Sequence, residues 1–374
     1  MTVAIAVPKE NRPLERRVAL VPAVAAKLQK LGAALALEAG AGDAAMIPDA
    51  LYAKAGVTVG ARNLGAADVV LKVQPPSLDE VRQMKEGAVL FSFVYAHREA
   101  ELVKALRDRR ITCFAMELVP RITRAQAMDA LSSQAALAGY YGALLGATQI
   151  GRMLPMTTFA TGSIKPGTIL VMGVGVAGLS AIATARRIGA RVEGYDVRPE
   201  VKEQVESLGA KFIETGVDAR GQGGYARELT QEEKDKIAAV VTKHIQAADV
   251  IITTAAIPGR PSPKLINKAQ IDGMKPGAAI VDLAAEGGGN TEYTKAGETY
   301  RQGNVTIAAP LNVPSLLAEH ASELYSKNLL NFLELIVKDG ALNLNWEDEV
   351  VAKSCLTHGG EIKNEAAKKA VEGA

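Results

Sequence analysis

The feature that most constrains this chain is a glycine-rich turn at 173–178, between an apolar run and a helical pattern. The run Thr168-Ile-Leu-Val-Met predicts a buried strand, and the residues from Leu179 to Ile188 predict a helix. A strand that passes into a helix through Gly-x-Gly-x-x-Gly is the setting in which this motif binds the pyrophosphate of a dinucleotide. The turn therefore predicts a Rossmann-type unit, with an unrelated glycine-rich turn as the alternative.

Each glycine of the turn has its own physical role in this prediction. Gly173 permits the tight turn, Gly175 lets the backbone approach a pyrophosphate, and Gly178 lets helix and strand pack closely. Val176 and Ala177 complete the candidate phosphate loop. The helix N-terminus beyond it offers N–H groups and a positive dipole end to the anion.

An acid follows the next predicted strand, at the position expected of a ribose ligand. That strand is Arg191–Tyr195, and Asp196 follows Gly173 by 23 residues. A carboxylate there can accept hydrogen bonds from both ribose hydroxyls of the adenosine and repels a 2′-phosphate, so NAD(H) is favoured over NADP(H). Val197 continues the site, and the cationic Arg198 weakens the preference without reversing it.

Strands and helices alternate twice along the chain, which predicts parallel sheets with crossover helices. The expected fold is α/β, with two Rossmann-like parallel-sheet domains, a cleft between them and long linking helices. Residues 1–130 plus 315–374 are assigned to an N-terminal lobe with returning C-terminal helices. Residues 131–314 are assigned to a linker helix and the NAD-binding domain. The expected strands are Val3–Val7, Ala34–Glu38, Val69–Val73, Val89–Phe93 and Thr112–Met116, then Thr168–Met172, Arg191–Tyr195, Val250–Thr254, Ala279–Leu283 and Val305–Ala308.

The end of the chain is predicted to pack back on the first lobe. After Pro314 the pattern indicates a helix to about Val337 and then an irregular, polar tail. Such a tail is too short to form a domain by itself.

Charge and rare residues exclude several classes of protein. Lys plus Arg number 43 against 41 Asp plus Glu, so there is no bulk charge to attract nucleic acid or anionic lipid. Cys113, Cys355 and the four histidines match no disulfide framework or metal-ligand spacing, so no metal is expected. The N-terminal residues predict a buried strand instead of a signal peptide, because no basic region precedes them.

One uncharged stretch, from Ala130 to Gly151, could be mistaken for a membrane span. Its serines, threonine and glutamines would carry polar groups into hydrocarbon, and its alanines and glycines supply little apolar area. We expect a long helix buried in protein, in which Gly142 and Gly146 allow close packing.

A dense polar cluster lies just ahead of that helix. It reads Pro120-Arg-Ile-Thr-Arg-Ala-Gln-Ala-Met-Asp-Ala-Leu-Ser-Ser133. A helix that began near Arg124 would place Gln126, Asp129, Ser132 and Ser133 along one face. That face could bind a carboxamide and a ribose in the cleft, or it could be a solvated surface; the residues alone leave both open.

The cluster closely resembles the Arg–Gln–Asp loop in the NAD(H)-binding domain of proton-translocating nicotinamide nucleotide transhydrogenases. The resemblance spans nearly the whole chain. It includes Pro8-Lys-Glu10, Arg17-Val-Ala, Gly173–Gly178, Tyr195-Asp-Val-Arg198, Thr253-Thr-Ala255-Ala-Ile-Pro-Gly-Arg-Pro, Val281-Asp-Leu-Ala-Ala-Glu286-Gly-Gly-Gly-Asn290 and Asn312-Val-Pro314.

The resemblance implies roles for residues that their spacing alone does not assign. Arg121 and Gln126 would contact the nicotinamide end, with Asp129 and Ser132 completing the network, and Ala255 would line the nucleotide. Gly223-Gly224-Tyr225 would lie on a mobile loop that closes over it, although a plain surface loop is the alternative. The resemblance also implies a homodimer that works with membrane-spanning and NADP(H)-binding partner subunits. The chain itself, without a membrane span, would be cytoplasmic and peripheral at the inner face of the plasma membrane.

Alanine dehydrogenases belong to the same family tree and must be separated by particular residues. Those enzymes hold a substrate carboxylate with an Arg and a Lys, which Arg17 and Lys72 match, and use a His and an Asp near the keto group. The His position corresponds to Tyr95, with His97 two residues further on, and the Asp position to Glu286. Amino-acid oxidation needs an acid or base within reach, whereas hydride exchange between two nicotinamides needs only aligned rings.

Three functions therefore remain for test. The residues favour hydride transfer from NADH to NADP⁺ held by a partner, since the sequence has one dinucleotide fingerprint. The alternatives are an NAD-dependent amino-acid dehydrogenase and a nucleotide-binding module without chemistry.

Overall fold

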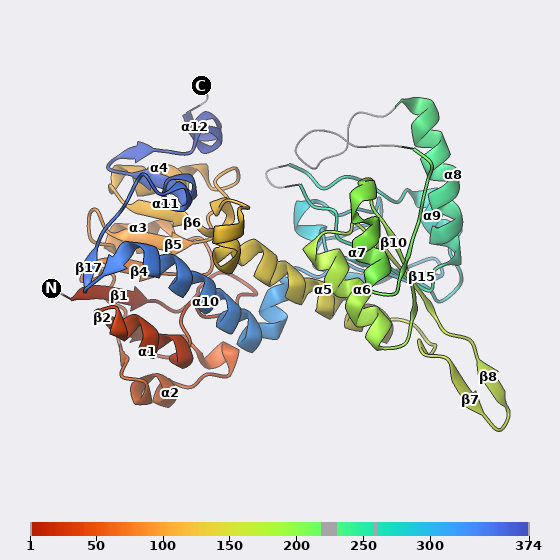
Figure 1. Cartoon of the computed structure of the whole chain (residues 1–374), viewed down its shortest axis with the longest axis horizontal. Helices are drawn as coiled ribbons and strands as arrows, with labels where there is room; N and C mark the ends of the chain where they lie inside the picture. Colours follow the sequence, from red (N-terminus) through yellow and green to blue (C-terminus); the bar gives the residue numbers. More distant parts are fainter. Residues whose placement is uncertain (1, 218–229, 258–259, 373–374) are drawn as a thin grey trace. The chain divides into compact units, whose positions relative to one another are not determined.

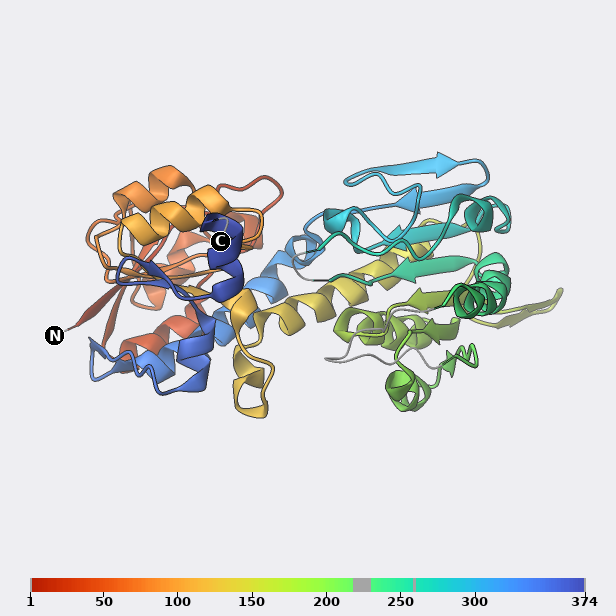
Figure 2. The same cartoon turned by 90° about the horizontal axis from the view of Figure 1, so that it is seen from above.

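The computed structural model describes residues 2–217, 230–257 and 260–372. The chain divides into two compact units, each built on its own sheet (Figures 1 and 2). Unit 1 comprises Met1–Gln134 and Pro314–Ala374, and unit 2 comprises Ala135–Val313. The first division falls inside helix α5 (Ala130–Thr148).

Unit 1 contains an eight-stranded sheet in the order β19-β18-β6-β5-β4-β1-β2-β3. The six strands from β3 to β6 in this order are parallel, β18 runs antiparallel to β6, and β19 runs antiparallel to β18. The predicted strands form within about two residues of their expected ends. Strands β4, β5 and β6 are buried on both faces, whereas β2 alternates between buried and exposed residues. The strands are β1 (Val3–Val7), β2 (Ala33–Glu38), β3 (Thr58–Gly60), β4 (Val69–Leu71), β5 (Val89–Ser92), β6 (Thr112–Ala115), β18 (Cys355–His358) and β19 (Glu361–Ile362).

The helices of unit 1 cover this sheet. The longest, α10 (Ala318–Ile336), buries an apolar face that includes Phe332 and Leu333. The others are α1 (Pro22–Lys30), α2 (Asp49–Lys54), α3 (Leu78–Gln83), α4 (Ala100–Asp108), α11 (Glu349–Ser354) and α12 (Glu365–Glu372), with 3-10 turns η1 (Asp43–Ala45), η2 (Met116–Leu118), η3 (Thr123–Met128) and η7 (Val313–Leu317).

The prediction of an irregular, polar tail after Val337 is wrong. The segment forms a hairpin of β16 (Val337–Lys338) and β17 (Ala341–Leu342), then α11, β18, β19 and α12. Strand β18 pairs antiparallel with β6, Thr357 opposite Cys113, so the tail extends the sheet of unit 1. Each of these strands is too short for periodicity to reveal. Strands β18 and β19 are stabilised by pairing at the edge of the existing sheet, whereas β16 and β17 pair only with each other.

Unit 2 contains a seven-stranded sheet in the order β11-β10-β9-β12-β13-β15-β14. All neighbours are parallel except β14, which runs antiparallel to β15 at one edge (light blue in Figure 2). Both sheets are thus α/β sheets as predicted, with antiparallel edge strands that the sequence did not reveal. The strands are β9 (Thr168–Met172), β10 (Arg191–Tyr195), β11 (Lys211–Phe212), β12 (Val250–Thr253), β13 (Ala279–Asp282), β14 (Thr299–Gln302) and β15 (Val305–Ala308).

A further pair of strands in unit 2 was not predicted. The hairpin of β7 (Thr157–Phe159) and β8 (Gly162–Ile164) projects from the rest of the unit in Figure 1. The helices of the unit, besides α5, are α6 (Val176–Arg187), α7 (Lys202–Ser207), α8 (Gln231–Ala247) and α9 (Lys268–Asp272), with 3-10 turns η4 (Pro199–Val201) and η6 (Ala285–Gly287).

Helix α5 packs closely on the sheet of unit 2, and this packing explains why its sequence is uncharged. A Cβ added at Gly146 would lie 2.6 Å from Val250 Cγ1, and one at Gly142 would lie 2.8 Å from Leu283 Cδ1. These distances confirm that the two glycines serve close packing inside protein. In the three described ranges, no helix has the length and apolar character needed to cross a membrane.

Candidate functional site

The glycine turn follows β9, which lies between β10 and β12 inside the sheet of unit 2, and its three glycines have different surroundings. Gly173 has φ +90°, and its carbonyl accepts a hydrogen bond from Thr254 Oγ1 at 2.8 Å. A Cβ at Gly178 would lie 2.0 Å from the Gly173 carbonyl oxygen, so only glycine fits there. A Cβ at Gly175 would meet nothing within 4 Å. The space above Gly175 is therefore open, and it fits an approaching phosphate.

Helix α6 begins at Val176, three residues before the predicted start. Its N-cap is Gly175, so no side chain of the cap accepts a hydrogen bond from the first turn. The backbone N–H groups and positive dipole end of the helix therefore lie directly at the turn, with Val176 and Ala177 as the first helical residues. This is the arrangement that the sequence predicted for anion binding, with a longer helix.

Asp196 follows β10 and braces the turn. Its carboxylate accepts a hydrogen bond from Val174 N at 2.7 Å and ion-pairs with the Arg198 guanidinium at 2.9 and 3.0 Å. Burial raises the pKa of Asp196, but the bonds from Arg198 and the backbone outweigh it and lower the pKa below the usual value. The acid therefore stays ionised at neutral pH, at the end of the strand beside the turn, where a Rossmann fold places its ribose ligand.

A buried amide fixes the chain at Ala255, after β12. Asn290 is fully buried; its Oδ1 accepts from Ala255 N at 3.0 Å, and its Nδ2 donates to Ala255 O and Pro263 O, each at 2.8 Å. The buried Asp282 in turn accepts from Asn290 N at 2.7 Å. In the sequence, Asn290 is recognisable only as the end of a motif. The signal was the run Gly287-Gly-Gly289 before it, which brings the backbone close enough for such a network.

The polar cluster of unit 1 does not form the helical face that the sequence suggested. Residues 123–128 form the 3-10 turn η3, and α5 starts only at Ala130. The physical reason is Asp129, whose carboxylate accepts bonds from Ser132 N at 2.9 Å and Ser132 Oγ at 2.6 Å. An Asp that bonds the N–H three residues later begins a new helix instead of continuing one. Asp129 and Ser132 thus lie together, while Arg121 and Gln126 are exposed.

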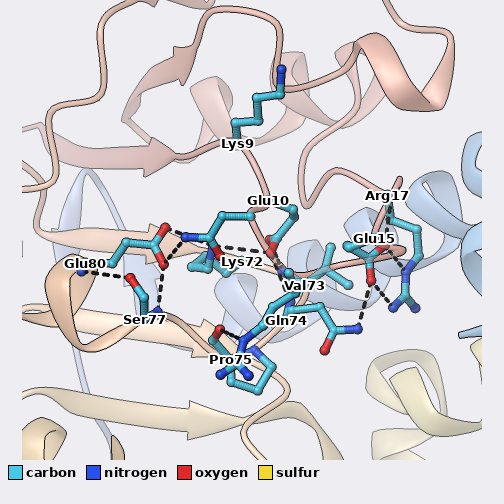
Figure 3. A network of polar contacts seen from close by, with 12 residues as sticks. Lys9, Glu10, Glu15, Arg17, Lys72, Val73, Gln74, Pro75, Ser77 and Glu80 are labelled. Atoms are coloured by element: carbon cyan, nitrogen blue, oxygen red, sulfur yellow. Dashed lines mark hydrogen bonds and ion pairs between the residues drawn. The ribbon is translucent and has the colours of Figure 1, made fainter.

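Arg17 and Lys72 are buried and held by carboxylates (Figure 3). Arg17 Nη2 lies 2.6 Å from Glu15 Oε2, and Arg17 Nη1 donates to Gln134 Oε1 at 2.9 Å. Burial raises the pKa of Glu15, but the bonds from Arg17 prevail and lower it to about 2.

Lys72 lies between two acids. Its Nζ is 3.2 Å from Glu10 Oε2 and 3.1 Å from Glu80 Oε1. Burial is the largest influence on Glu10 and raises its pKa in spite of Lys72. Arg17 and Lys72, which match the substrate-binding Arg and Lys of alanine dehydrogenases, are therefore both paired with carboxylates of this chain. These contacts by themselves explain why the two cations are buried, without a bound substrate.

The two remaining positions that distinguish alanine dehydrogenases lie in the segments that follow β5 and β13. Tyr95, where alanine dehydrogenases would have His, has φ +53°, and Glu117 accepts a hydrogen bond from its backbone N–H at 2.5 Å. His97 is exposed. Glu286 accepts a hydrogen bond from Asn312 N at 2.8 Å. Gly224 and Tyr225, predicted to close over the nucleotide, fall outside the described residues.

The strand order of unit 2, the glycine turn after β9 and the acid after β10 are those of a Rossmann-type nucleotide-binding protein. Comparison with known families is more specific. The N-terminal domain of alanine dehydrogenase/PNT matches residues 6–138, and the C-terminal domain of alanine dehydrogenase/PNT matches residues 142–365. The chain therefore belongs to the alanine dehydrogenase/PNT family, as its motifs predicted.

Individual relatives place the chain within the family. It is 48% identical over 376 residues to the first portion of NAD(P) transhydrogenase subunit alpha from Rhodospirillum rubrum, with 97% of this chain and 98% of that protein covered. It is 28% identical over 377 residues to alanine dehydrogenase of Methanococcus maripaludis, covering 98% and 96%. The crystal structure of transhydrogenase from Sinorhizobium meliloti matches with a TM-score of 0.86 at 44% identity, covering 97% of this chain and 99% of that one. The alanine dehydrogenase is thus the more distant of these relatives.

Proposed function

We propose that this chain is the NAD(H)-binding subunit of a proton-translocating transhydrogenase. In this proposal it transfers hydride between NADH and NADP⁺ that a partner subunit holds. The observation that carries it is the full-length similarity to a transhydrogenase alpha subunit polypeptide, at 48% identity against 28% for an alanine dehydrogenase. At the level of residues, Tyr95 in place of a histidine supports it, because ring-to-ring hydride transfer needs no acid or base.

The residues of unit 2 would bind the phosphate and adenosine parts of NAD(H). Gly173, Gly175 and Gly178, with the first turn of α6, supply the phosphate loop, and the open space above Gly175 supports this role. The ionised Asp196 would bind the ribose hydroxyls, with Val197, Arg198 and Ala255 beside them; Gly224 and Tyr225 are proposed to close over the nucleotide.

The residues of unit 1 would orient the reacting end. Exposed Arg121 and Gln126 would contact the nicotinamide, and the bonded pair Asp129–Ser132 would complete the network. Bound NADH would supply the hydride, and NADP⁺ on the partner would accept it. We further propose that the chain acts as a homodimer at the inner face of the membrane, through membrane-spanning and NADP(H)-binding partners.

One set of assays separates the three functions. Hydride transfer from NADH to an NADP⁺ analogue is measured with and without the candidate partner subunits, alongside NADH oxidation with pyruvate and ammonia. We expect transfer only with the partners. Turnover of pyruvate and ammonia by the chain alone would instead establish an amino-acid dehydrogenase, and NADH binding without any turnover would leave a binding module.

The role of the unit 1 residues has its own test. Gln126→Asn withdraws the amide by one methylene, so it should slow hydride transfer about tenfold or more with little change in the Kd for NADH. Gln204→Asn, an exposed glutamine on α7, is the matched control and should change neither. Equal losses of rate and affinity in Gln126→Asn would mean that the residue binds without positioning.

A further inference from the structure

The segment that carries the proposed nicotinamide contacts, residues 121–132, is held by side chains from far along the chain. We call this segment the polar loop. Its Arg124 forms a bidentate ion pair with Asp348, with Nη1 2.8 Å from Oδ2 and Nη2 2.5 Å from Oδ1. More than 200 residues separate the two in sequence. Two parallel bonds fix the plane of the guanidinium as well as its distance.

Asp348 is itself fixed to the body of unit 1. Its Oδ1 also accepts from Val350 N at 2.8 Å, which makes Asp348 the N-cap of α11. Val350 and Val351 are buried in the same apolar core as Ala125 and Met128 of the polar loop. Asp348 therefore connects one end of η3 to a rigid element.

A second anchor holds the other end of η3. Asn328 on α10, only 6% exposed, donates from Nδ2 to Ala127 O at 2.8 Å. Its Oδ1 accepts from Ser133 Oγ, also at 2.8 Å, in the first turn of α5. Gln126 thus lies between two residues, Arg124 and Ala127, that are each bonded to another helix.

We propose that Asp348 and Asn328 are positioning residues, which set the orientation at which the polar loop presents Gln126 and Asp129 to the nicotinamide. The inference rests on the proposed function and adds residues that the motif itself does not contain. A 3-10 turn has weak internal hydrogen bonds, so η3 depends on outside contacts for a single conformation. A misplacement of about 1 Å in a positioning group can cost about 100-fold in rate, whereas the phosphate loop of unit 2 would retain most of the affinity.

Asp348→Asn is the critical variant. Asn caps helices as well as Asp does, so α11 keeps its N-cap, but the charged bidentate pair with Arg124 is lost. We expect hydride transfer with the partner subunits to fall about tenfold, while the Kd for NADH changes less than about twofold. Arg124→Met should have the same effect, and the double variant should be no slower than either single one, because both remove one contact.

The matched control is Lys353→Met, which removes the exposed Lys353–Glu349 ion pair on the same helix without touching the polar loop. It should leave the rate unchanged. Trp346, the single tryptophan of the chain, packs against His358 with ring centroids 4.4 Å apart and reports on the tail. Its emission should be the same in Asp348→Asn as in the unsubstituted protein, which would show that the tail remains packed.

A readout independent of activity separates this inference from the proposed function. Amide hydrogen exchange over 123–128 should accelerate about tenfold in Asp348→Asn, with exchange in α10 unchanged. If the unsubstituted protein transfers no hydride with its partners, the proposed function fails, but the exchange result still decides whether Asp348 fixes the loop. Unaltered exchange, an unaltered rate in an active protein, or parallel losses of rate, affinity and Trp346 emission would each overturn the positioning role.

Discussion

Units 1 and 2 share the order of their parallel strands but differ in the loop that follows the first strand. The parallel strands run β3-β2-β1-β4-β5-β6 in unit 1 and β11-β10-β9-β12-β13-β15 in unit 2. In each unit, an acid at the end of the second strand accepts a hydrogen bond from a backbone N–H in the loop after the first strand. Glu38 accepts from Lys9 N at 2.9 Å, and Asp196 accepts from Val174 N at 2.7 Å.

The resemblance extends to the partner of each acid. Arg62 pairs with Glu38 as Arg198 pairs with Asp196. The loops themselves differ. In unit 2 only residues 173–175 separate β9 from α6, and they leave open space at Gly175. In unit 1 residues 8–21 separate β1 from α1, and their acids bond the buried cations Lys72 and Arg17.

The comparison teaches that a doubly wound sheet provides a place for a nucleotide but does not by itself bind one. A short glycine turn exposes backbone N–H groups to an anion. A longer loop that carries carboxylates fills the corresponding place in unit 1 with ion pairs. Four variants or conditions test this difference, each with a counterpart or a control.

The largest effect is expected from Lys72→Met. It leaves Glu10 and Glu80 buried without their ammonium partner, so the free energy of unfolding should fall by about 3–5 kcal/mol. Lys275→Met in unit 2 removes a half-exposed partner of Asp249 and should cost less than about 1 kcal/mol. Urea unfolding measures both. Similar losses in the two variants would show that the unit 1 network is no more tightly coupled than a surface pair.

Acid should weaken the same network. The pKa of Glu15 is about 2 in the folded chain, below its usual value of 4.5. The stability from this carboxylate is therefore fully present above pH 4.5 and is lost as the pH falls toward 2, on the order of 3 kcal/mol in total. We measure the free energy of unfolding in urea at pH 5 and at pH 3. Its decrease from pH 5 to pH 3 should be smaller for Glu15→Gln than for the unsubstituted protein. Identical decreases would exclude Glu15 as a source of the pH dependence.

Gly175→Val should separate binding from folding. The added side chain occupies open space at a residue with negative φ, so Tm should change little, whereas a bound phosphate would be displaced. The Kd for NADH should rise about 100-fold, equivalent to about 2.7 kcal/mol. Lys9→Ala in the corresponding loop of unit 1 should not change it, since Lys9 points away from the buried network in Figure 3 and no nucleotide is proposed there. Isothermal titration measures both; a loss of affinity in Lys9→Ala would contradict the assignment of binding to unit 2 alone.

The smallest effect is expected for nucleotide selectivity. Asp196→Asn removes the charge that repels a 2′-phosphate and leaves Arg198 without its anion, so the preference for NADH over NADPH should drop about tenfold. Glu38→Gln, at the same place in unit 1, should leave the preference unaltered. Competitive titration of the two nucleotides decides this, and an unchanged ratio in Asp196→Asn would mean that another residue selects the cofactor.

Sequence patterns predicted the buried strands and the glycine turn between β9 and α6 well. Strands such as β1 and β9 are wholly apolar over 3–7 and 169–172, so burial on both faces follows from composition. The tight turn at Gly173 and the close packing at Gly178 could be predicted because each depends on the absence of a side chain in a local turn. The edge strand β14 was missed because two of its residues are exposed and carry no apolar signal.

Contacts between distant residues were beyond prediction. Lys72 with Glu10, Asn290 with Ala255 and Arg124 with Asp348 each join segments far apart in the chain, and no periodicity records such pairs. The cap of α5 at Asp129 was missed for a related reason. A short polar segment can continue a helix or begin one, and bonds to α10 and Asp348 favour the 3-10 turn before it.

The amino-acid sequence alone was enough to predict the α/β class, the family and the position of the glycine turn, because these depend on local patterns of burial and on backbone freedom. Three outcomes became visible only in the folded chain. The tail adds strands to the sheet of unit 1, Arg17 and Lys72 pair with carboxylates inside unit 1, and the polar loop is bonded to α10 and to the N-cap of α11. Those outcomes depend on which side chains the folded chain brings together, and that depends on packing across hundreds of residues.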